Sequence, residues 1–305
     1  MPAIRTSFLA SLLFLTACKR DSAQATSDTS LTRAQPPAST PSRYAATGWP
    51  DDAGPVVVLP GASVGEVRLV MPELTDATLT DTSSFELDSL PHAEIVLYSR
   101  GQKSTPATIE GSGTEDDPRG CKSWPGARLG SYRGEAWSFG LAADVARELP
   151  LHTWGSLLTA DSVDAAAAII QIAATVRNDS TFAGIPFGVR YLYRLELGGG
   201  GGRTIVADAV RRINTEANVR EQHVLVIAER IGTSSRYRGA YREAQTGRED
   251  AVRVPEIVGA VLLGENRRPA LFVSLEYSEG SRLVLLERDP SARWVSRWRS
   301  AYTGC

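Results

Sequence analysis

Acidic and imidazole side chains gather in one short polar stretch between two apolar runs of the chain. The stretch runs from Asn214 to His223 and contains Glu216, Glu221 and His223. A carboxylate and an imidazole in hydrogen-bonding reach can pass a proton to and from a substrate. These three residues are therefore candidate catalytic acid–base groups, and the alternative that we favour is a polar hairpin loop.

Two tryptophans near the C-terminus are candidate ligand-binding residues. Trp294 and Trp298 are four positions apart, so on a strand they share one face with Ser296 between them. Two indoles in line could form a platform on which a sugar stacks. Large aromatic pairs more often cap the core of a sheet, and we favour that interpretation.

The other patterns point away from metal and nucleotide sites. The chain has three histidines, and no two of them lie within five residues of each other, so the zinc-binding helix motif is absent. No Gly-x-Ser-x-Gly elbow and no Walker loop occurs. The glycines at 198–202 are interpreted as a hairpin turn, and the acidic loop at 114–118 as a solvated loop rather than a calcium site. We expect neither a metal nor a cofactor.

The elements that would position these residues are mostly strands. Apolar residues alternate with polar ones from Phe187 to Leu197, which predicts a strand with one buried face carrying Phe187, Val189, Tyr191, Tyr193, Leu195 and Leu197. Residues 204–213 could form a strand or a helix, and we favour the strand, followed by another at 223–231. Further strands are predicted at 56–59, 66–70, 94–98 and 137–141, and a four-strand meander at 257–263, 271–277, 283–287 and 294–299.

One segment, about 161–178, has the pattern of a helix. Asp161 is the predicted N-cap, and the apolar positions at helical spacing are Val163, Ala166, Ala167, Ile170 and Ala174. A single helix among many strands usually packs on a sheet face. The predicted fold class is α+β and β-dominated, with antiparallel strands and one packed helix.

The run Arg268–Tyr277 is similar to blades of FG-GAP-type propellers. The calcium loop of those blades is absent, because Leu263-Gly264-Glu265-Asn266 stands at its place. The resemblance therefore implies no calcium ion in this chain.

The N-terminus has the order of an export signal. Arg5 supplies a positive charge, and the apolar run from Phe8 to Leu15 is shorter than the ~20 residues that span a bilayer. The following Leu15-Thr16-Ala17-Cys18 resembles the lipobox of bacterial lipoproteins at all four positions. That resemblance implies cleavage after Ala17, acylation of Cys18 and anchorage in a lipid bilayer. Lys19 replaces the Asp that favours inner-membrane retention, which favours the outer membrane, facing the periplasm, of a Gram-negative host.

The sequence divides into three parts by composition. Residues 1–17 are the predicted signal peptide, and residues 18–47 are a predicted disordered tether rich in Ser, Thr, Ala, Pro and Gln. Residues 48–305 are a predicted β-rich globular domain, with two halves at about 48–150 and 151–305 as an alternative. Once Cys18 is assigned to the anchor, Cys121 and Cys305 remain, and an oxidising compartment would pair them.

Charge and composition disfavour some classes of function but do not identify the function. The net charge is −2, and removing the basic signal and tether leaves a more acidic folded part. Dispersed acidity disfavours nucleic acid as a partner. We expect an envelope binding or structural protein that contacts an envelope protein or glycan. The alternative is a cell-envelope hydrolase, acting on glycan or peptide, without a recognisable motif.

Overall fold

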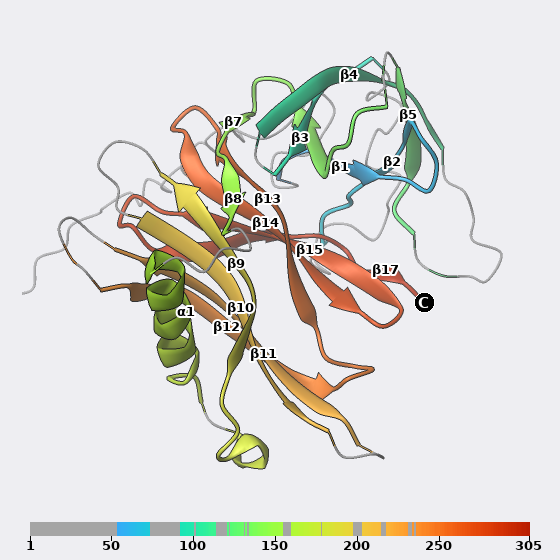
Figure 1. The fold of residues 1–305 in the computed structure, drawn as a ribbon. Helices are drawn as coiled ribbons and strands as arrows, with labels where there is room; N and C mark the ends of the chain where they lie inside the picture. The colour runs from blue at the N-terminus through green and yellow to red at the C-terminus, as the bar shows by residue number, and fades with distance from the viewer. Residues whose placement is uncertain are drawn as a thin grey trace, which may run out of the picture. The chain divides into compact units, whose positions relative to one another are not determined.

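The strand-rich pattern of the sequence produces three antiparallel sheets and one α-helix in the described part of the chain (Figure 1). The structure is a computed structural model. It describes residues 54–73, 92–100, 102–113, 121, 123–130, 132, 134–154, 160–177, 179–197, 203–214, 218–230, 234 and 236–305. The predicted α+β, β-dominated fold class is confirmed.

The first sheet closes on itself as a six-stranded barrel in the order β1-β2-β5-β4-β3-β6, with β6 paired to β1. Its apolar alternate residues fill the interior, among them Val58, Leu69, Ile95, Leu97 and Ile109. The strands are β1 (Val57–Pro60), β2 (Glu66–Leu69), β3 (Glu94–Ser99), β4 (Gln102–Gly113), β5 (Gly126–Gly130) and β6 (Phe139–Ala142).

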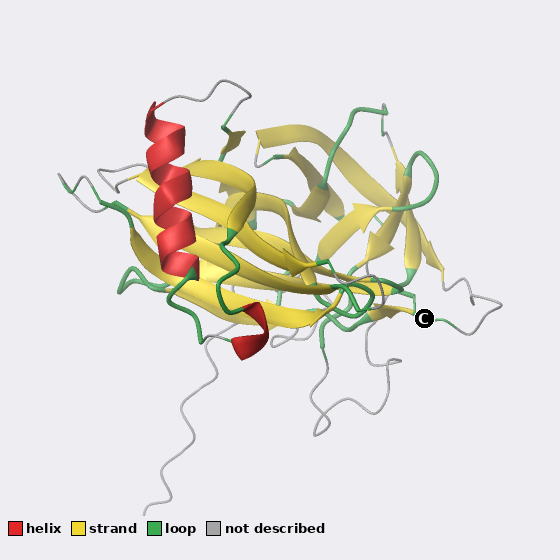
Figure 2. Ribbon diagram, turned by 60° about the horizontal axis from the view of Figure 1, so that its bottom comes forward, coloured by secondary structure: helices red, strands yellow, loops and turns green. Residues whose placement is uncertain are grey.

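The second sheet, which we call the helix-covered sheet, has the order β12-β11-β10-β9-β8. Its strands are β8 (Leu151–Thr153), β9 (Gly188–Glu196), β10 (Arg203–Ile213), β11 (Arg220–Glu229) and β12 (Arg238–Arg248). Helix α1 (Ala160–Ala173) lies across one face of this sheet (Figure 2), and a short 3-10 turn, η3 (Ser180–Phe182), precedes β9.

The third sheet, which we call the central sheet, packs on the barrel with one face and on the helix-covered sheet with the other. Alternate residues of β14 divide between the two cores: Phe272 lies in the barrel-side core, and Leu271 and Val273 lie in the core between the sheets. Burial on both faces explains why this strand is a continuous apolar run. The strands are β7 (Ala146–Glu148), β13 (Val254–Leu263), β14 (Arg268–Tyr277), β15 (Gly280–Arg288), β16 (Trp294–Arg299) and β17 (Thr303–Gly304).

The predicted meander is confirmed, because β13, β14, β15 and β16 pair in sequence order. They form part of one sheet and not the blade of a propeller. The predicted strand at 204–213 is also confirmed as β10. The sequence analysis missed β4, β5, β7, β8, β12 and β17. No residue of β12 is fully buried, so its polar sequence lacks the apolar alternation that predicts a strand.

The helix is present, but its predicted details are wrong in two respects. It begins at Ala160 and ends at Ala173, so Asp161 lies in the first turn and is not the N-cap. Its buried residues are Ser162, Ala165, Ile169 and Ala173, whereas Val163 is 52% exposed. Ala and Ile occur on nearly every side of this helix, so apolar spacing fits more than one stripe and does not fix the buried face.

Strand β9 does not keep one face buried along its length, as the alternation predicts. Its register on β10 shifts between Asp208 and Ala209, so Tyr191 lies opposite Asp208 and Val189 lies opposite Ala209. Val189 therefore packs under α1, whereas Tyr193 and Leu195 pack between the sheets. Arg190 is the extra residue of this β-bulge, and a bulge redirects a side chain that regular pleating would place on the other face.

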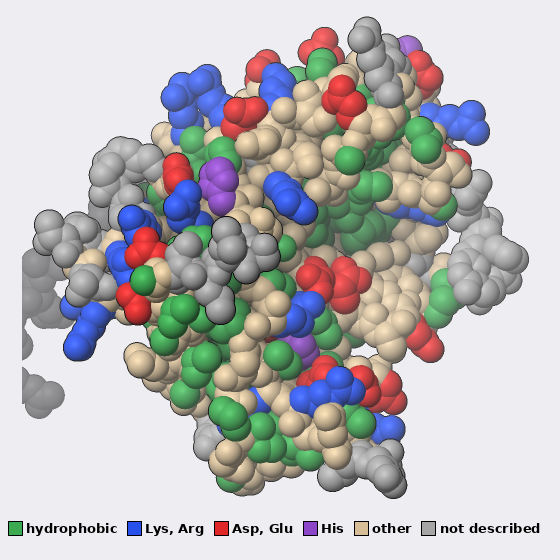
Figure 3. All heavy atoms as spheres, viewed as in Figure 1, with side chains coloured by type: hydrophobic (Ala, Val, Ile, Leu, Met, Phe, Trp, Pro, Cys, Tyr) green, Lys and Arg blue, Asp and Glu red, His purple; other side chains and the backbone are tan. Residues whose placement is uncertain are grey.

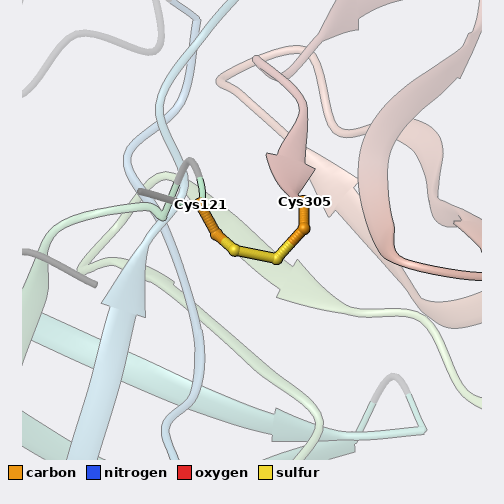
Figure 4. The surroundings of a disulfide bond; sticks show 2 residues. All are labelled: Cys121 and Cys305. Carbon is orange, nitrogen blue, oxygen red and sulfur yellow. A yellow bond between two sulfur atoms is a disulfide. The ribbon is translucent and has the colours of Figure 1, made fainter. Parts of the chain in front are cut away.

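The barrel and the central sheet are joined near the end of the chain. Pro72 forms a β-bridge with Ser300, the backbone N–H of Ala301 donates to the Met71 carbonyl at 2.8 Å, and Trp124 Nε1 donates to the Ala301 carbonyl at 3.2 Å. Cys121 forms a disulfide with Cys305, as the sequence analysis expects (Figure 4).

Some of the sequence predictions concern residues that the structure does not describe. The signal peptide 1–17, Cys18, the tether 18–47, the acidic loop 114–118 and the glycines at 198–202 all lie outside the described residues. Among the described residues, no helix has the length and hydropathy needed to cross a membrane.

Removing the Cys121–Cys305 disulfide should destabilise the fold, because the bond closes a loop with a sequence separation of 184. We expect a loss of about 2–5 kcal/mol in the free energy of unfolding on reduction, measured by denaturant titration. In a C121S/C305S variant, the reductant should have no further effect. Equal stability of oxidised and reduced wild-type protein would contradict this expectation.

Truncating Ile169 tests which face of α1 is buried, because Ile169 belongs to this helix and is fully buried. Ile169→Ala should lower the free energy of unfolding by about 2–4 kcal/mol. Val163→Ala, on the exposed side, should change it by less than about 0.5 kcal/mol. The reverse order of effects would restore the face predicted from the sequence.

Candidate functional site

One buried polar group of the fold is a carboxylate inside the helix-covered sheet. Asp208 interrupts the apolar run of β10 and is 0% exposed. A buried carboxylate is costly unless donors or cations compensate its charge. Arg190 and His223 supply that compensation. We define the Asp208 cluster as a set of residues from strands β9, β10, β11 and β13, namely Arg190, Tyr191, Asp208, Glu221, His223 and Glu256.

His223 lies beside Asp208 on the neighbouring strand β11 and is 3% exposed. Its Nδ1 is 2.8 Å from Asp208 Oδ2, and its Nε2 is 3.1 Å from Glu221 Oε2. Each ring nitrogen therefore faces a carboxylate oxygen. Because a carboxylate only accepts hydrogen bonds, both nitrogens donate when His223 carries two ring protons.

Arg190 links Asp208 to the central sheet. Its Nε donates to Asp208 Oδ2 at 2.7 Å, one Nη donates to the Pro255 carbonyl at 2.5 Å, and the other pairs with Glu256. The Tyr191 hydroxyl donates to the same Pro255 carbonyl at 2.9 Å. The bulge in β9 thus supplies two side chains that hold the start of β13.

The two oxygens of Asp208 are used unequally. Oδ2 receives both the His223 and the Arg190 contacts, whereas no donor in the described part of the chain reaches the buried Oδ1. The stability of this carboxylate therefore depends on two donors, and losing either leaves its charge poorly compensated.

Glu221 connects the cluster to solvent-exposed charges. Its Oε1 is 3.3 Å from Arg212 Nε, and Arg212 also pairs with Glu249. Acidic and basic side chains are interspersed in this way over the face of the molecule shown in Figure 3. Charge is thus balanced locally, and exposed pairs of this kind add little stability each.

The surroundings shift the pKa of three members of the cluster. Burial would lower the pKa of Arg190, but the hydrogen bonds and charges of Glu256 and Asp208 raise it. Burial alone would lower the pKa of His223, but the hydrogen bonds and charges of Asp208 and Glu221 outweigh it, so the pKa is raised above 6.5. Burial, with the charge of Asp208, raises the pKa of Tyr191 well above 10.0. Tyr191 therefore stays protonated and remains a donor to Pro255.

This geometry suits a structural charge cluster better than a catalytic one. A general base needs a free ring nitrogen within reach of substrate, whereas both nitrogens of His223 contact carboxylates. Those carboxylates lie on opposite sides of the ring. In the part of the chain that the structure describes, no group of three or more His, Cys, Asp or Glu residues could hold a metal ion.

The predicted acid–base candidates are only partly placed by the structure. Glu221 and His223 are brought together, but they lie within strand β11 and not in a loop, and Glu216 is outside the described residues. The sequence analysis missed Asp208, Arg190 and Glu256. A lone Asp in an apolar strand was an available signal for the first, whereas the bulge and the contact with β13 depend on tertiary structure.

The sequence analysis expects the two tryptophans on one face of a strand, but they lie in separate cores, because the register of β16 on β15 shifts between Leu285 and Leu286. Trp294 is 3% exposed between the sheets and donates from Nε1 to Glu229 Oε1 at 2.7 Å; Trp298 is 9% exposed in the barrel-side core. A bound sugar would need an exposed indole face. Both positions therefore agree with packing in the core. Neither indole has the exposed face on which a sugar could stack.

The chain matches no protein-family model, no curated protein and no solved structure. Its function is therefore inferred from its own residues.

Replacing Arg190 should destabilise the protein by leaving Asp208 with His223 as its remaining donor. For Arg190→Met we expect a loss of about 2–4 kcal/mol in the free energy of unfolding, measured by denaturant titration. Arg248→Met is the matched control, because Arg248 pairs with Asp250 on the surface of the same sheet, where both side chains are more than half exposed. Its loss should stay under about 1 kcal/mol. Equal losses in the two variants would contradict a special role for Arg190.

Proposed function

We propose that this chain is an exported bacterial lipoprotein whose folded part acts as a binding or structural module of the cell envelope. The observation that carries the proposal is the run Leu15-Thr16-Ala17-Cys18 directly after an apolar segment. Acylation of Cys18 would hold the protein at a lipid bilayer, and two or three acyl chains suffice for a stable anchor.

The disulfide supports export independently of the N-terminal residues. Cys121 and Cys305 pair with each other, so every cysteine beyond the proposed anchor is oxidised. Disulfides of this kind persist in extracytoplasmic compartments and are rare in the cytosol. Lys19 at the position after Cys18 favours the outer membrane, facing the periplasm, if the host is Gram-negative.

A binding or structural role is favoured over catalysis by the way the Asp208 cluster is occupied. Its carboxylates, imidazole and guanidinium contact one another and the Pro255 carbonyl. Among the described residues, the large hydrophobic side chains that are exposed are Val64, in the turn between β1 and β2, and Val163, on α1. An envelope protein or glycan that binds here would therefore meet a largely polar surface.

An envelope hydrolase acting on glycan or peptide is the second candidate. The observation in its favour is a buried His223 whose pKa is shifted by a specific carboxylate, since perturbed groups of this kind concentrate at functional sites. Hydrolysis of envelope glycan or peptide by the purified protein, lost in His223→Gln while the fold is retained, would support it.

Substituting Cys18→Ser tests the proposed anchor. The variant should leave the membrane fraction and lose labelling by a palmitate probe, because the thiol that would carry the lipid is gone. C121S/C305S is the matched control, which removes two cysteines elsewhere and should keep the label. Membrane association and labelling that persist in Cys18→Ser would overturn the proposal.

A further inference from the structure

The Asp208 cluster joins the two sheets at a point where one titratable ring holds two carboxylates. Asp208, Glu221 and His223 belong to the helix-covered sheet, and Pro255 and Glu256 begin strand β13 of the central sheet. Arg190 and Tyr191 cross from one sheet to the other. Arg190, which makes contacts across the sheets, therefore shares Asp208 with His223, a group that can lose a proton.

We propose that the cluster is a pH-operated clamp, closed when His223 carries two ring protons and loosened when it loses one. This inference does not depend on where the protein is held, so it stands apart from the proposed lipid anchor.

The closed state follows from the hydrogen-bond geometry. Asp208 Oδ2 and Glu221 Oε2 lie within 3.1 Å of opposite ring nitrogens. In the neutral ring, one nitrogen would present a lone pair to a carboxylate oxygen, which is repulsive. The doubly protonated ring instead donates to both oxygens and supplies a positive charge between two negative ones.

The charged and titratable groups around His223 come from every neighbouring strand. Strand β10 supplies Asp208, and also Arg212, which pairs with Glu221. Strand β9 supplies Arg190 and Tyr191, and strand β13 supplies Glu256. Strand β12 places Gln245 opposite His223, and Gln245 donates to Glu243, which also accepts from Tyr241. The arginines stay charged and Tyr191 stays protonated in the range where an imidazole titrates, so His223 is the group in the cluster that changes charge near neutral pH.

Loss of one ring proton to solvent has a defined structural consequence. If the proton leaves Nδ1, the buried Asp208 keeps Arg190 as its donor and faces the lone pair of the ring. If the proton leaves Nε2, Glu221 loses the hydrogen bond that His223 donates to it. In either case a carboxylate of the cluster keeps its negative charge with less compensation. Water that enters between β9 and the start of β13 would then solvate this charge. The expected change is local, since the remainder of β13 pairs with β14 over five register positions, from Gly259 to Leu263.

The direction of the pH effect follows from the raised pKa of His223. The folded protein binds this proton more tightly than the unfolded chain, so the stabilisation is fully present below about 6.5 and is lost as pH rises through the higher folded pKa. The clamp is therefore closed in acid-to-neutral conditions and loosens on the alkaline side.

Two measurements on the wild-type full chain test the clamp without requiring a variant to fold. In an NMR titration, the ring carbons of His223 should report a midpoint above about 6.5. Hydrogen exchange, corrected for intrinsic rates at each pH, should show protection at residues 189–192 and 254–257 falling by about tenfold or more relative to residues 271–273 across that midpoint.

Variants assign the effect to the cluster. In His223→Gln, the protection at 189–192 and 254–257 should no longer depend on pH. His152→Gln is the matched control, because His152 lies exposed on β8 of the same sheet, and it should keep the wild-type dependence. A His223 midpoint at or below about 6.5, or protection that does not change across the midpoint in the wild-type chain, would overturn the proposal.

Discussion

A carboxylate that water cannot reach sets the conditions that its neighbours must meet. Asp208 lies in the middle of β10 with 0% exposure, and two donors on adjacent strands hold its Oδ2. Burying an ionised carboxylate without such partners would cost more free energy than most domains can lose. The bulge that presents Arg190 and the ring of His223, held between two carboxylates, meet this requirement.

The layers around the cluster show why it can join two sheets. The central sheet is buried on both faces, against the barrel through Phe272 and against the helix-covered sheet through Leu271 and Val273. Apolar packing of this kind is strong but not directional. The hydrogen bonds of Arg190 and Tyr191 to β13 are directional, so they fix where one sheet begins relative to the other.

The sequence predicts the parts of this structure that depend on local patterns. The four-strand meander and the disulfide follow from apolar runs, turns and cysteine parity, whereas β12 was missed because its edge position tolerates polar residues on both faces. The face of α1 was wrong because alanines surround the helix. Glu221 and His223 were predicted as candidates together with Glu216. Arg190 was not predicted, since a bulge breaks the strand alternation from which the direction of its side chain is inferred.

The central claim is that Asp208 and Arg190 act as one unit, and a double-mutant cycle measures this directly. The free energies of unfolding of wild type, Asp208→Asn, Arg190→Met and the double variant give the coupling between the two side chains. We predict a coupling of about 2 kcal/mol or more, because the double variant removes the buried charge together with its partner. Losses that add within about 0.5 kcal/mol would contradict the account.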